Sequence, residues 1–275
     1  MISLVVATLN RTTDLDRLLF SLDEQSYQNF EVVVVDQNPD ARLVPILHRH
    51  PGLAIRHLRS ERGLSLSRNI GLGSIHGDIV AFPDDDCWYP KTLLAEVAAW
   101  FDSHEDPGFL ITAVRDADGQ PSSSRLPTTR RPCTRNNVWS CAMSTGLFMR
   151  RSLTNAVGAF DENMGVGAPT AYQSGEEIDY VLRALAIGFH GTCEPALTVH
   201  HPPLGSLDRL RRTTYSYALS TGRLQRIHRF APQWLAWHLL RSFGGAVIRL
   251  CRGDLARSRL YVLRGAGQLA GYLSD

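Results

Sequence analysis

Short apolar runs alternate with amphipathic stretches over the first third of the chain. The apolar runs are rich in valine and isoleucine, as expected of strands that are buried on both faces of a sheet. Four such strands are predicted at residues 2–7, 31–36, 53–58 and 79–82. Helices with apolar residues at helical spacing are predicted between them at about 12–22, 41–50 and 64–76, the last ended by Gly77. This alternation predicts an α/β fold with a mostly parallel sheet flanked by helices.

The pattern is less regular after residue 110. Residues 116–132, rich in Ser, Pro, Thr and Arg, predict a surface loop. A strand is expected at 148–150, followed by a helix from Ser152, and a second helix at 176–186 has one apolar face. The chain from about residue 207 to the end is predicted to be helical.

The helical tail is strongly basic. Residues 201–275 contain twelve arginines and only three acids, a net charge of +9, whereas the whole chain carries +2 and its remainder therefore −7. We expect two domains, 1–204 and 205–275, the second suited to an anionic partner. Residues 234–250 are apolar and aromatic but too interrupted for a membrane span, so they predict either a helix in a lipid headgroup layer or a cap on the first domain.

The five cysteines are scattered, and no C-x-x-C pair occurs. Neither a disulfide framework nor a structural zinc site is expected, and a reducing compartment fits this pattern. The first residues run directly into a predicted strand without a basic, signal-like segment. The expected location is therefore the cytoplasm, with peripheral contact to the inner face of the plasma membrane as the alternative that the tail allows.

Polar residues follow three of the predicted strands. They are Asn10-Arg11, Asp36 and the run Asp84-Asp85-Asp86. In open sheets of this kind ligands bind at the carboxyl ends of the strands, so the three clusters predict a crevice for a nucleotide or phosphate. Three adjacent carboxylates repel one another unless water or a cation neutralises them, and Mg²⁺ or Mn²⁺ would do so with oxygen ligands shared with a phosphate.

Several segments together resemble one known family. They are the opening Ile2–Arg11, the second strand Phe30–Asp36, the segment Gly63–Leu72, the aspartates Asp84–Asp86, the turn Gly158–Glu162 and the run Gly175–Asp179. Their order and spacing resemble a family 2 glycosyltransferase of the GT-A fold over about residues 1–202. The resemblance implies a Rossmann-like catalytic domain and an inverting enzyme, and the predicted helical tail would form a C-terminal appendage to that domain.

The resemblance also implies which residues bind the donor. Those expected to contact the nucleotide-sugar are Thr8, Asn10, Arg11, Asp36, Arg68, Asp84 and Asp85. The aspartates look like the family's D-x-D motif, and the metal, Mn²⁺ or Mg²⁺, is assigned to Asp86, Asp85 and His200. The register of the triplet leaves Asp85 and Asp86 open as the main ligand, and His201 remains an alternative to His200. Arg68 either contacts the diphosphate or lies on a helix surface.

A second acidic cluster, Glu176-Glu177-x-Asp179, begins the predicted helix at 176. Carboxylates at a helix start also interact favourably with the helix dipole, so a capping role is one reading. The other is a general base that takes the proton from the acceptor hydroxyl. Glu177 is the first choice for that base and Asp179 the second.

The function that these features indicate is transfer of a sugar from a UDP-, dTDP- or GDP-sugar to a glycan or lipid-linked acceptor, in bacterial polysaccharide biosynthesis. Nucleic acid is not an expected partner. Two alternatives remain: a non-catalytic GT-A-like module that binds a glycan or a membrane, and a nucleotidyltransferase on a related sheet. The second would be expected to have glycines after the first strand, where Thr8–Thr13 has none.

Overall fold

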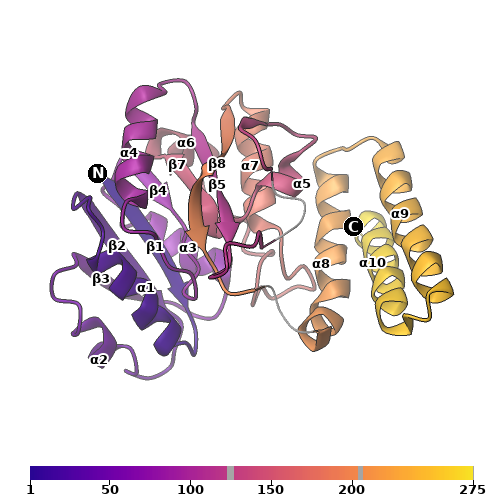
Figure 1. Ribbon diagram of the computed structural model, residues 1–275, viewed down its shortest axis with the longest axis horizontal. Helices are drawn as coiled ribbons and strands as arrows, with labels where there is room; N and C mark the ends of the chain where they lie inside the picture. Colours follow the sequence, from indigo (N-terminus) through magenta and orange to yellow (C-terminus); the bar gives the residue numbers. More distant parts are fainter. Residues whose placement is uncertain (123–126, 204–206, 275) are drawn as a thin grey trace. The chain divides into compact units, whose positions relative to one another are not determined.

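A computed structural model describes residues 1–122, 127–203 and 207–274. The chain forms two compact units (Figure 1). The first comprises Met1–Phe160 and Tyr180–Leu204, and the second comprises Asp161–Asp179 and Gly205–Asp275. The division between the units falls within the helix α7 (Glu176–Ala186), the helix that the sequence predicted at the same residues.

The first unit is built on one eight-stranded sheet, in the order β3-β2-β1-β4-β7-β5-β8-β6. The first four strands are parallel to one another, as predicted, whereas β7 is antiparallel to β4 and β5, and β6 is antiparallel to β8. The mostly parallel α/β sheet is therefore confirmed. The strands are β1 (Ile2–Thr8), β2 (Phe30–Asp36), β3 (Ile55–Arg59), β4 (Ile79–Ala81), β5 (Phe109–Arg115), β6 (Arg131–Cys133), β7 (Leu147–Arg150) and β8 (Gly191–His200).

Helices cover both faces of this sheet (Figure 1). Alternate residues of β1 and β2 pack in one core cluster with apolar residues of α1 and α4, while Gly71 of α3 lies against Val5 and Val35, which point the opposite way. Burial on both faces explains why these strands are continuously apolar. The helices of the first unit are α1 (Thr13–Asp23), α2 (Val44–Leu47), α3 (Leu64–Leu72), α4 (Leu93–Ser103), α5 (Val138–Cys141) and α6 (Arg151–Val157).

Two predicted helices are shorter in the structure. The helix expected at 41–50 is the single turn α2, and α3 ends at Leu72 instead of continuing to residue 76. The reason for the earlier end is close packing, since the Gly77 backbone lies against β1 and donates its N–H to Ser3 Oγ at 2.8 Å. A Cβ at position 77 would lie 2.7 Å from the Ser3 nitrogen, so the chain must turn before it reaches this point.

Several elements were not predicted, among them α4, α5, β5 and β6. The helix α4 and the strand β5 carried no assignment, and β6 lies at the end of the stretch that was predicted to be a loop, of which residues 123–126 are outside the described residues. β6 is only three residues long and owes its conformation to pairing with β8, so its own sequence carries little strand signal.

The second unit contains three long helices, which confirms the helical prediction for this region. They are α8 (Leu207–Ile227), α9 (Pro232–Cys251) and α10 (Leu255–Leu273). The backbones of α8 and α10 approach closely where glycines leave room. A Cβ at Gly222 would lie 2.0 Å from the Gln268 carbonyl oxygen, and a Cβ at Gly271 would lie 1.9 Å from the Leu219 carbonyl oxygen. Over the described residues, no helix is long and apolar enough to cross a lipid bilayer.

Candidate active site

The carboxyl ends of β2, β1 and β4 lie side by side in the first unit. The parallel register pairs Thr8 with Asp36, the last residues of β1 and β2, and pairs β1 with β4 on its other side. Asp84–Asp86 follow β4 after Phe82 and Pro83, and Asp85 contacts Arg11, so all three polar clusters come to one edge of the sheet. The predicted convergence is thus confirmed in the fold.

Arg11 binds two of the three aspartates. Its guanidinium forms an ion pair with Asp85 Oδ1 at 2.8 Å and another with Asp86 Oδ2. Burial outweighs the attraction of Arg11 and raises the pKa of Asp85 to about 6. Burial acts in the same direction on Asp86, but contacts with His201 and Arg11 outweigh it and lower the pKa of that carboxyl to about 2. Neighbouring carboxylates in one triplet therefore differ strongly in basicity.

Asp84, Asp86 and His201 form a candidate metal site. One ligand atom from each lies within 4.8 Å of the others. His201 is buried, with Nε2 at 3.1 Å from Asp86 Oδ1. The neighbouring residue His200, which the sequence analysis preferred, instead stacks on Trp88 with ring centroids 5.4 Å apart. Asp85 is not part of this group of three, and its Oδ1 accepts a hydrogen bond from Arg11 at 2.8 Å.

The donor atoms of this group suit a divalent cation. His201 Nδ1 lies 2.6 Å from the Pro202 carbonyl oxygen, which can only accept, so Nδ1 carries a proton. Neutral imidazole then presents the Nε2 lone pair toward Asp86 Oδ1, a buried oxygen that accepts no hydrogen bond from the described residues. Burial lowers the pKa of His201, but contact with Asp86 outweighs it and raises that pKa above its usual value. Two carboxylates and one imidazole are compatible with Mn²⁺ or Mg²⁺.

Arg68 of α3 is buried beneath the aspartates, not exposed on a helix surface. Its guanidinium lies over the rings of Phe82 and Phe160, at 5.7 and 5.5 Å from their centroids, and 3.6 Å from Asp84 Oδ1. The side chain is only 2% exposed. A buried arginine packed against two aromatic rings is a rigid positive charge, which suits a site that binds phosphate groups.

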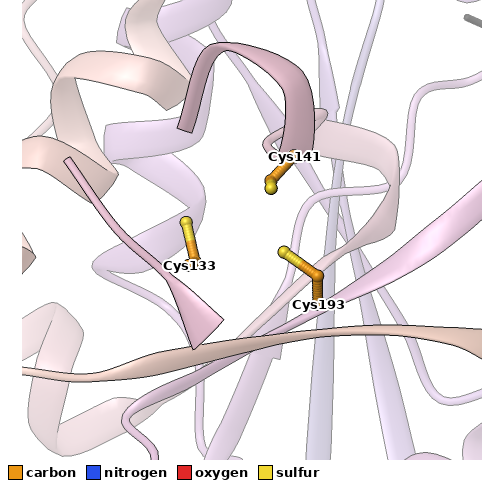
Figure 2. A group of neighbouring side chains, drawn as sticks. All are labelled: Cys133, Cys141 and Cys193. Atoms are coloured by element: carbon orange, nitrogen blue, oxygen red, sulfur yellow. The ribbon is translucent and has the colours of Figure 1, made fainter. Parts of the chain in front are cut away.

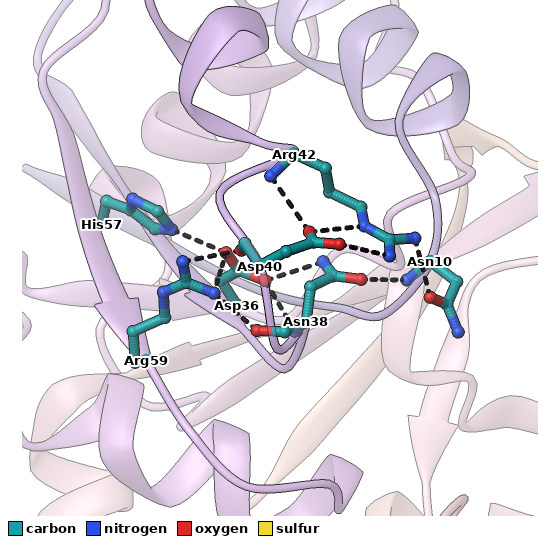
Figure 3. Close-up of polar contacts among 7 residues, drawn as sticks. All are labelled: Asn10, Asp36, Asn38, Asp40, Arg42, His57 and Arg59. Carbon is teal, nitrogen blue, oxygen red and sulfur yellow. Dashed lines mark hydrogen bonds and ion pairs between the residues drawn. The ribbon is translucent and has the colours of Figure 1, made fainter.

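Asp36 is fully buried at the end of β2 and is bound by three side chains (Figure 3). One carboxylate oxygen accepts hydrogen bonds from the backbone and side chain of Asn38, at 2.8 and 2.7 Å. The other lies 3.0 Å from both His57 Nε2 and Arg59 Nη1, on β3. The contacts hold Asp36 in one orientation at the carboxyl edge of the sheet.

Asn10 links this cluster to the loop after β1 (Figure 3). Its backbone has a φ of 61°, a left-handed conformation that asparagine tolerates better than most residues. Its N–H donates to Asn38 Oδ1 at 2.7 Å, and its own Oδ1 accepts from Arg42 at 2.9 Å. The network joins the predicted donor-binding residues Asn10 and Asp36, and Thr8 lies opposite Asp36 in the β1–β2 register.

The second acidic cluster occupies the first turn of α7, in the second unit. Glu176 and Asp179 are buried, whereas Glu177 is partly exposed. Asp179 Oδ1 accepts a hydrogen bond from His228 Nε2 at 2.8 Å, so this carboxylate is bound by a side chain of the same unit. Of the two predicted bases, Glu177 is the more exposed to solvent.

Two residues that support the triplet were not predicted from the sequence. Arg17 donates to the Asp86 carbonyl oxygen at 2.7 Å and lies over the Trp88 ring, while the Ser144 hydroxyl donates to Asp84 Oδ1 at 3.4 Å. Arg17 is on the polar side of an amphipathic helix and Ser144 is in a short 3₁₀ turn, neither of which marks a residue as functional in the sequence.

The model of one protein family, described as "Glycosyl transferase family 2", matches residues 3–158. The chain belongs to glycosyl transferase family 2. The match contains the residues at the carboxyl ends of β1, β2 and β4, together with Arg68.

Related sequences and structures agree with this family. An uncharacterized glycosyltransferase of Bacillus subtilis, YwdF, is 25% identical over 169 residues, 59% of this chain and 63% of its own length. The poly(ribitol-phosphate) β-N-acetylglucosaminyltransferase TarS of Staphylococcus aureus is 31% identical over 115 residues, 40% of this chain and 20% of its own length. The matched region thus spans less than two thirds of either relative.

Solved structures of two glycosyltransferases share the fold. TarS residues 1–349, solved with UDP-GlcNAc, matches 98% of this chain and 90% of its own at a TM-score of 0.64 and 16% identity. The second is the mannosyltransferase PcManGT of Pyrobaculum calidifontis, solved with GDP-Man and Mn²⁺. The match covers 98% of this chain and 86% of the PcManGT chain, with a TM-score of 0.65 and 18% identity. These likenesses confirm the GT-A fold.

Proposed function

We propose that this chain is an inverting, metal-dependent glycosyltransferase that moves a sugar from a nucleotide-sugar to a glycan or lipid-linked acceptor in bacterial polysaccharide biosynthesis. The observation that carries the proposal is the group Asp84, Asp86 and His201, beside the buried Arg68, in a member of glycosyl transferase family 2. In this proposal residues 1–204 form the catalytic domain and residues 205–275 an appendage.

The donor is proposed to be a UDP-, dTDP- or GDP-sugar. The structural neighbours support this class, since one was solved with UDP-GlcNAc and another with GDP-Man and Mn²⁺. Within the first unit, the loops that carry Asn10 and Asp36 adjoin the aspartates, so the nucleoside and the diphosphate would lie along one edge of the sheet.

Charge on the leaving nucleoside diphosphate determines what the residues must do. A Mn²⁺ or Mg²⁺ ion held by Asp84, Asp86 and His201 would supply electrostatic stabilisation of that charge. Arg68 provides a fixed positive charge next to Asp84. Arg11 pairs with both Asp85 and Asp86 and so offsets the repulsion between these two carboxylates. These interactions favour departure of the diphosphate and do not depend on the identity of the sugar.

Glu177 is proposed to take the proton from the acceptor hydroxyl as that hydroxyl attacks the anomeric carbon. A single displacement of this kind inverts the configuration at that carbon. Asp179 is the weaker candidate, because its carboxylate is already bound by His228.

Binding and product analysis together test the proposal. We expect one nucleotide-sugar from a panel of UDP-, dTDP- and GDP-sugars to raise the unfolding temperature in the presence of Mn²⁺, since a ligand at 100 times its Kd stabilises the folded state by about 2.7 kcal/mol. With that donor and an acceptor, the product should have the opposite anomeric configuration by NMR. Retained configuration, or no stabilisation by any nucleotide-sugar, would overturn the proposal.

The second unit is proposed to make peripheral contact with an anionic membrane. Along α9, four residues that fall on one helical face are each more than half exposed: Trp237, Leu240, Val247 and Ile248. Arg241 lies at the edge of this apolar stripe, and the unit is basic overall. Apolar side chains beside arginines suit a helix that lies in a headgroup layer.

Sedimentation with vesicles tests the membrane contact. The full chain should pellet with vesicles rich in anionic lipid at low salt, and the double variant Trp237→Glu, Leu240→Glu should remain in the supernatant. Phe20→Glu is the matched control, because Phe20 is 63% exposed on α1 of the first unit. Equal pelleting of the double variant and the native chain would refute the contact.

A further inference from the structure

Three of the five cysteines lie together in the first unit, although they are far apart in the sequence. Cys133 is on β6, Cys141 ends α5 and Cys193 is on β8. Their sulfur atoms all lie within 4.8 Å of one another and point into a common space (Figure 2). All three side chains are buried, at 4%, 0% and 2% exposure.

Strand pairing explains how the first two thiols meet. In the antiparallel β6–β8 ladder Arg131 is opposite Cys193, and Cys133 is opposite Gly191. Residues 131 and 133 share one face of β6, so Cys133 and Cys193 are diagonal neighbours on the same face of the pair. The chain then leaves β6 and α5 places Cys141 beside that face. The lack of a C-x-x-C pair therefore did not exclude a thiol site, because the ligands come from three separate elements.

The spacing of the sulfur atoms suits a metal ion. A cation bound to three thiolates at about 2.3 Å requires sulfur–sulfur distances of roughly 3.8 Å in tetrahedral geometry and roughly 4.0 Å in a trigonal plane. The observed sulfur atoms, all within 4.8 Å of one another, lie in the range from which such an arrangement can form. A disulfide would instead join two sulfurs at about 2.05 Å and leave the third thiol unused.

The surroundings also suit such a centre. A complex of three thiolates with a monovalent or divalent cation has a net negative charge. Arg131 Nη2 lies 3.8 Å from Cys141 Sγ, so its guanidinium offsets that charge. Among the described residues, no aspartate, glutamate or histidine joins the three thiols. Thiolate ligands select soft cations, whereas the oxygen-rich group at Asp84 and Asp86 selects hard ones.

We propose that Cys133, Cys141 and Cys193 form a binding site for a thiophilic d¹⁰ cation: Zn²⁺ with one small additional ligand, or Cu⁺ with three thiolates alone. The bound cation cross-links β6 and α5 to β8, the strand that leads to His201. The site is separate from the candidate metal group at Asp84 and Asp86, and it does not depend on the proposed transferase activity.

Metal titration of the reduced full-length chain tests the proposal. Cd²⁺, as the spectroscopic probe, should produce a thiolate-to-metal charge-transfer band that saturates at one equivalent per chain. The single variants Cys133→Ser, Cys141→Ser and Cys193→Ser should each lose this band. Cys251→Ser is the matched control, since Cys251 is an exposed cysteine of the second unit, and it should bind one equivalent. Asp86→Asn should also keep the band, which distinguishes the thiol site from the oxygen-rich site.

X-ray absorption of the native chain keeps the test decisive if a serine variant fails to fold. Bound Zn²⁺ should show three sulfur neighbours at about 2.3 Å and one lighter atom, and bound Cu⁺ three sulfur neighbours only. Zinc surrounded only by nitrogen and oxygen, or copper without sulfur, would overturn the proposal. So would a fully reduced native chain that fails to bind Cd²⁺.

Discussion

Asp86→Asn is expected to lower kcat about 10²–10³-fold, because the substitution removes a buried carboxylate from the group that would hold the cation next to the leaving diphosphate. The remaining activity should require a higher Mn²⁺ concentration. Release of nucleoside diphosphate, measured while Mn²⁺ is titrated, gives both quantities. Asp102→Asn is the control, since Asp102 is exposed on α4, and it should match the native chain in both.

Asp85→Asn separates the two possible registers of the triplet. Asp85 is bound by Arg11 and lies outside the metal group, so its substitution should reduce activity less than Asp86→Asn and leave the Mn²⁺ requirement nearly unchanged. The opposite ranking, with Asp85→Asn raising the Mn²⁺ requirement and Asp86→Asn leaving it unchanged, would contradict the assignment of Asp84 and Asp86 as the D-x-D pair. Circular dichroism and the unfolding temperature establish that each variant is folded.

Glu177→Gln is expected to lower kcat about 10²–10⁴-fold, the usual contribution of a general base, while donor binding stays unchanged. Glutamine keeps the size of the side chain but cannot accept the proton of the acceptor hydroxyl. The pH–rate profile should therefore lose its acidic limb, an effect that loss of a helix-capping carboxylate would not produce. Steady-state kinetics across pH, with thermal shift for donor binding, measure both results.

The controls distinguish Glu177 from its neighbours. Glu105→Gln, an exposed glutamate of the first unit, should have native kinetics. Asp179→Asn disturbs the contact with His228 and should lower the unfolding temperature as well as the rate, with the acidic limb still present. If Glu177→Gln kept full activity and Asp179→Asn lost the acidic limb, the base would be Asp179.

The sequence was sufficient for the core of the first unit because its strands are buried on both faces. Continuous apolar runs predicted β1, β2 and β4 to within one residue at each end, and the alternation with helices predicted their parallel order. Since parallel strands end at one edge of a sheet, the sequence alone predicted that Asp36 and Asp84–Asp86 lie close together.

The choice between His200 and His201 could not be made from the sequence. Successive side chains of a strand point to opposite faces, so one of the two histidines reaches Asp86 and the other reaches Trp88. Which one does so depends on an irregularity in β8: Thr112 pairs with Glu194, but Ala113 pairs with Thr198. Residues 195–197 are therefore extra in β8. Because their number is odd, every later side chain points to the face opposite to the one that regular alternation would give it.

By itself, the sequence determined the α/β class, the parallel strands, the acidic clusters and the helical tail, because each follows from local periodicity or from strand order. Only the tertiary structure decided that His201 joins Asp84 and Asp86, that Arg68 is buried against two aromatic rings, and that three distant cysteines meet. These contacts join residues from separate elements, and they depend on strand register and helix packing. Those interactions form between segments, so no single stretch of the chain carries their signal.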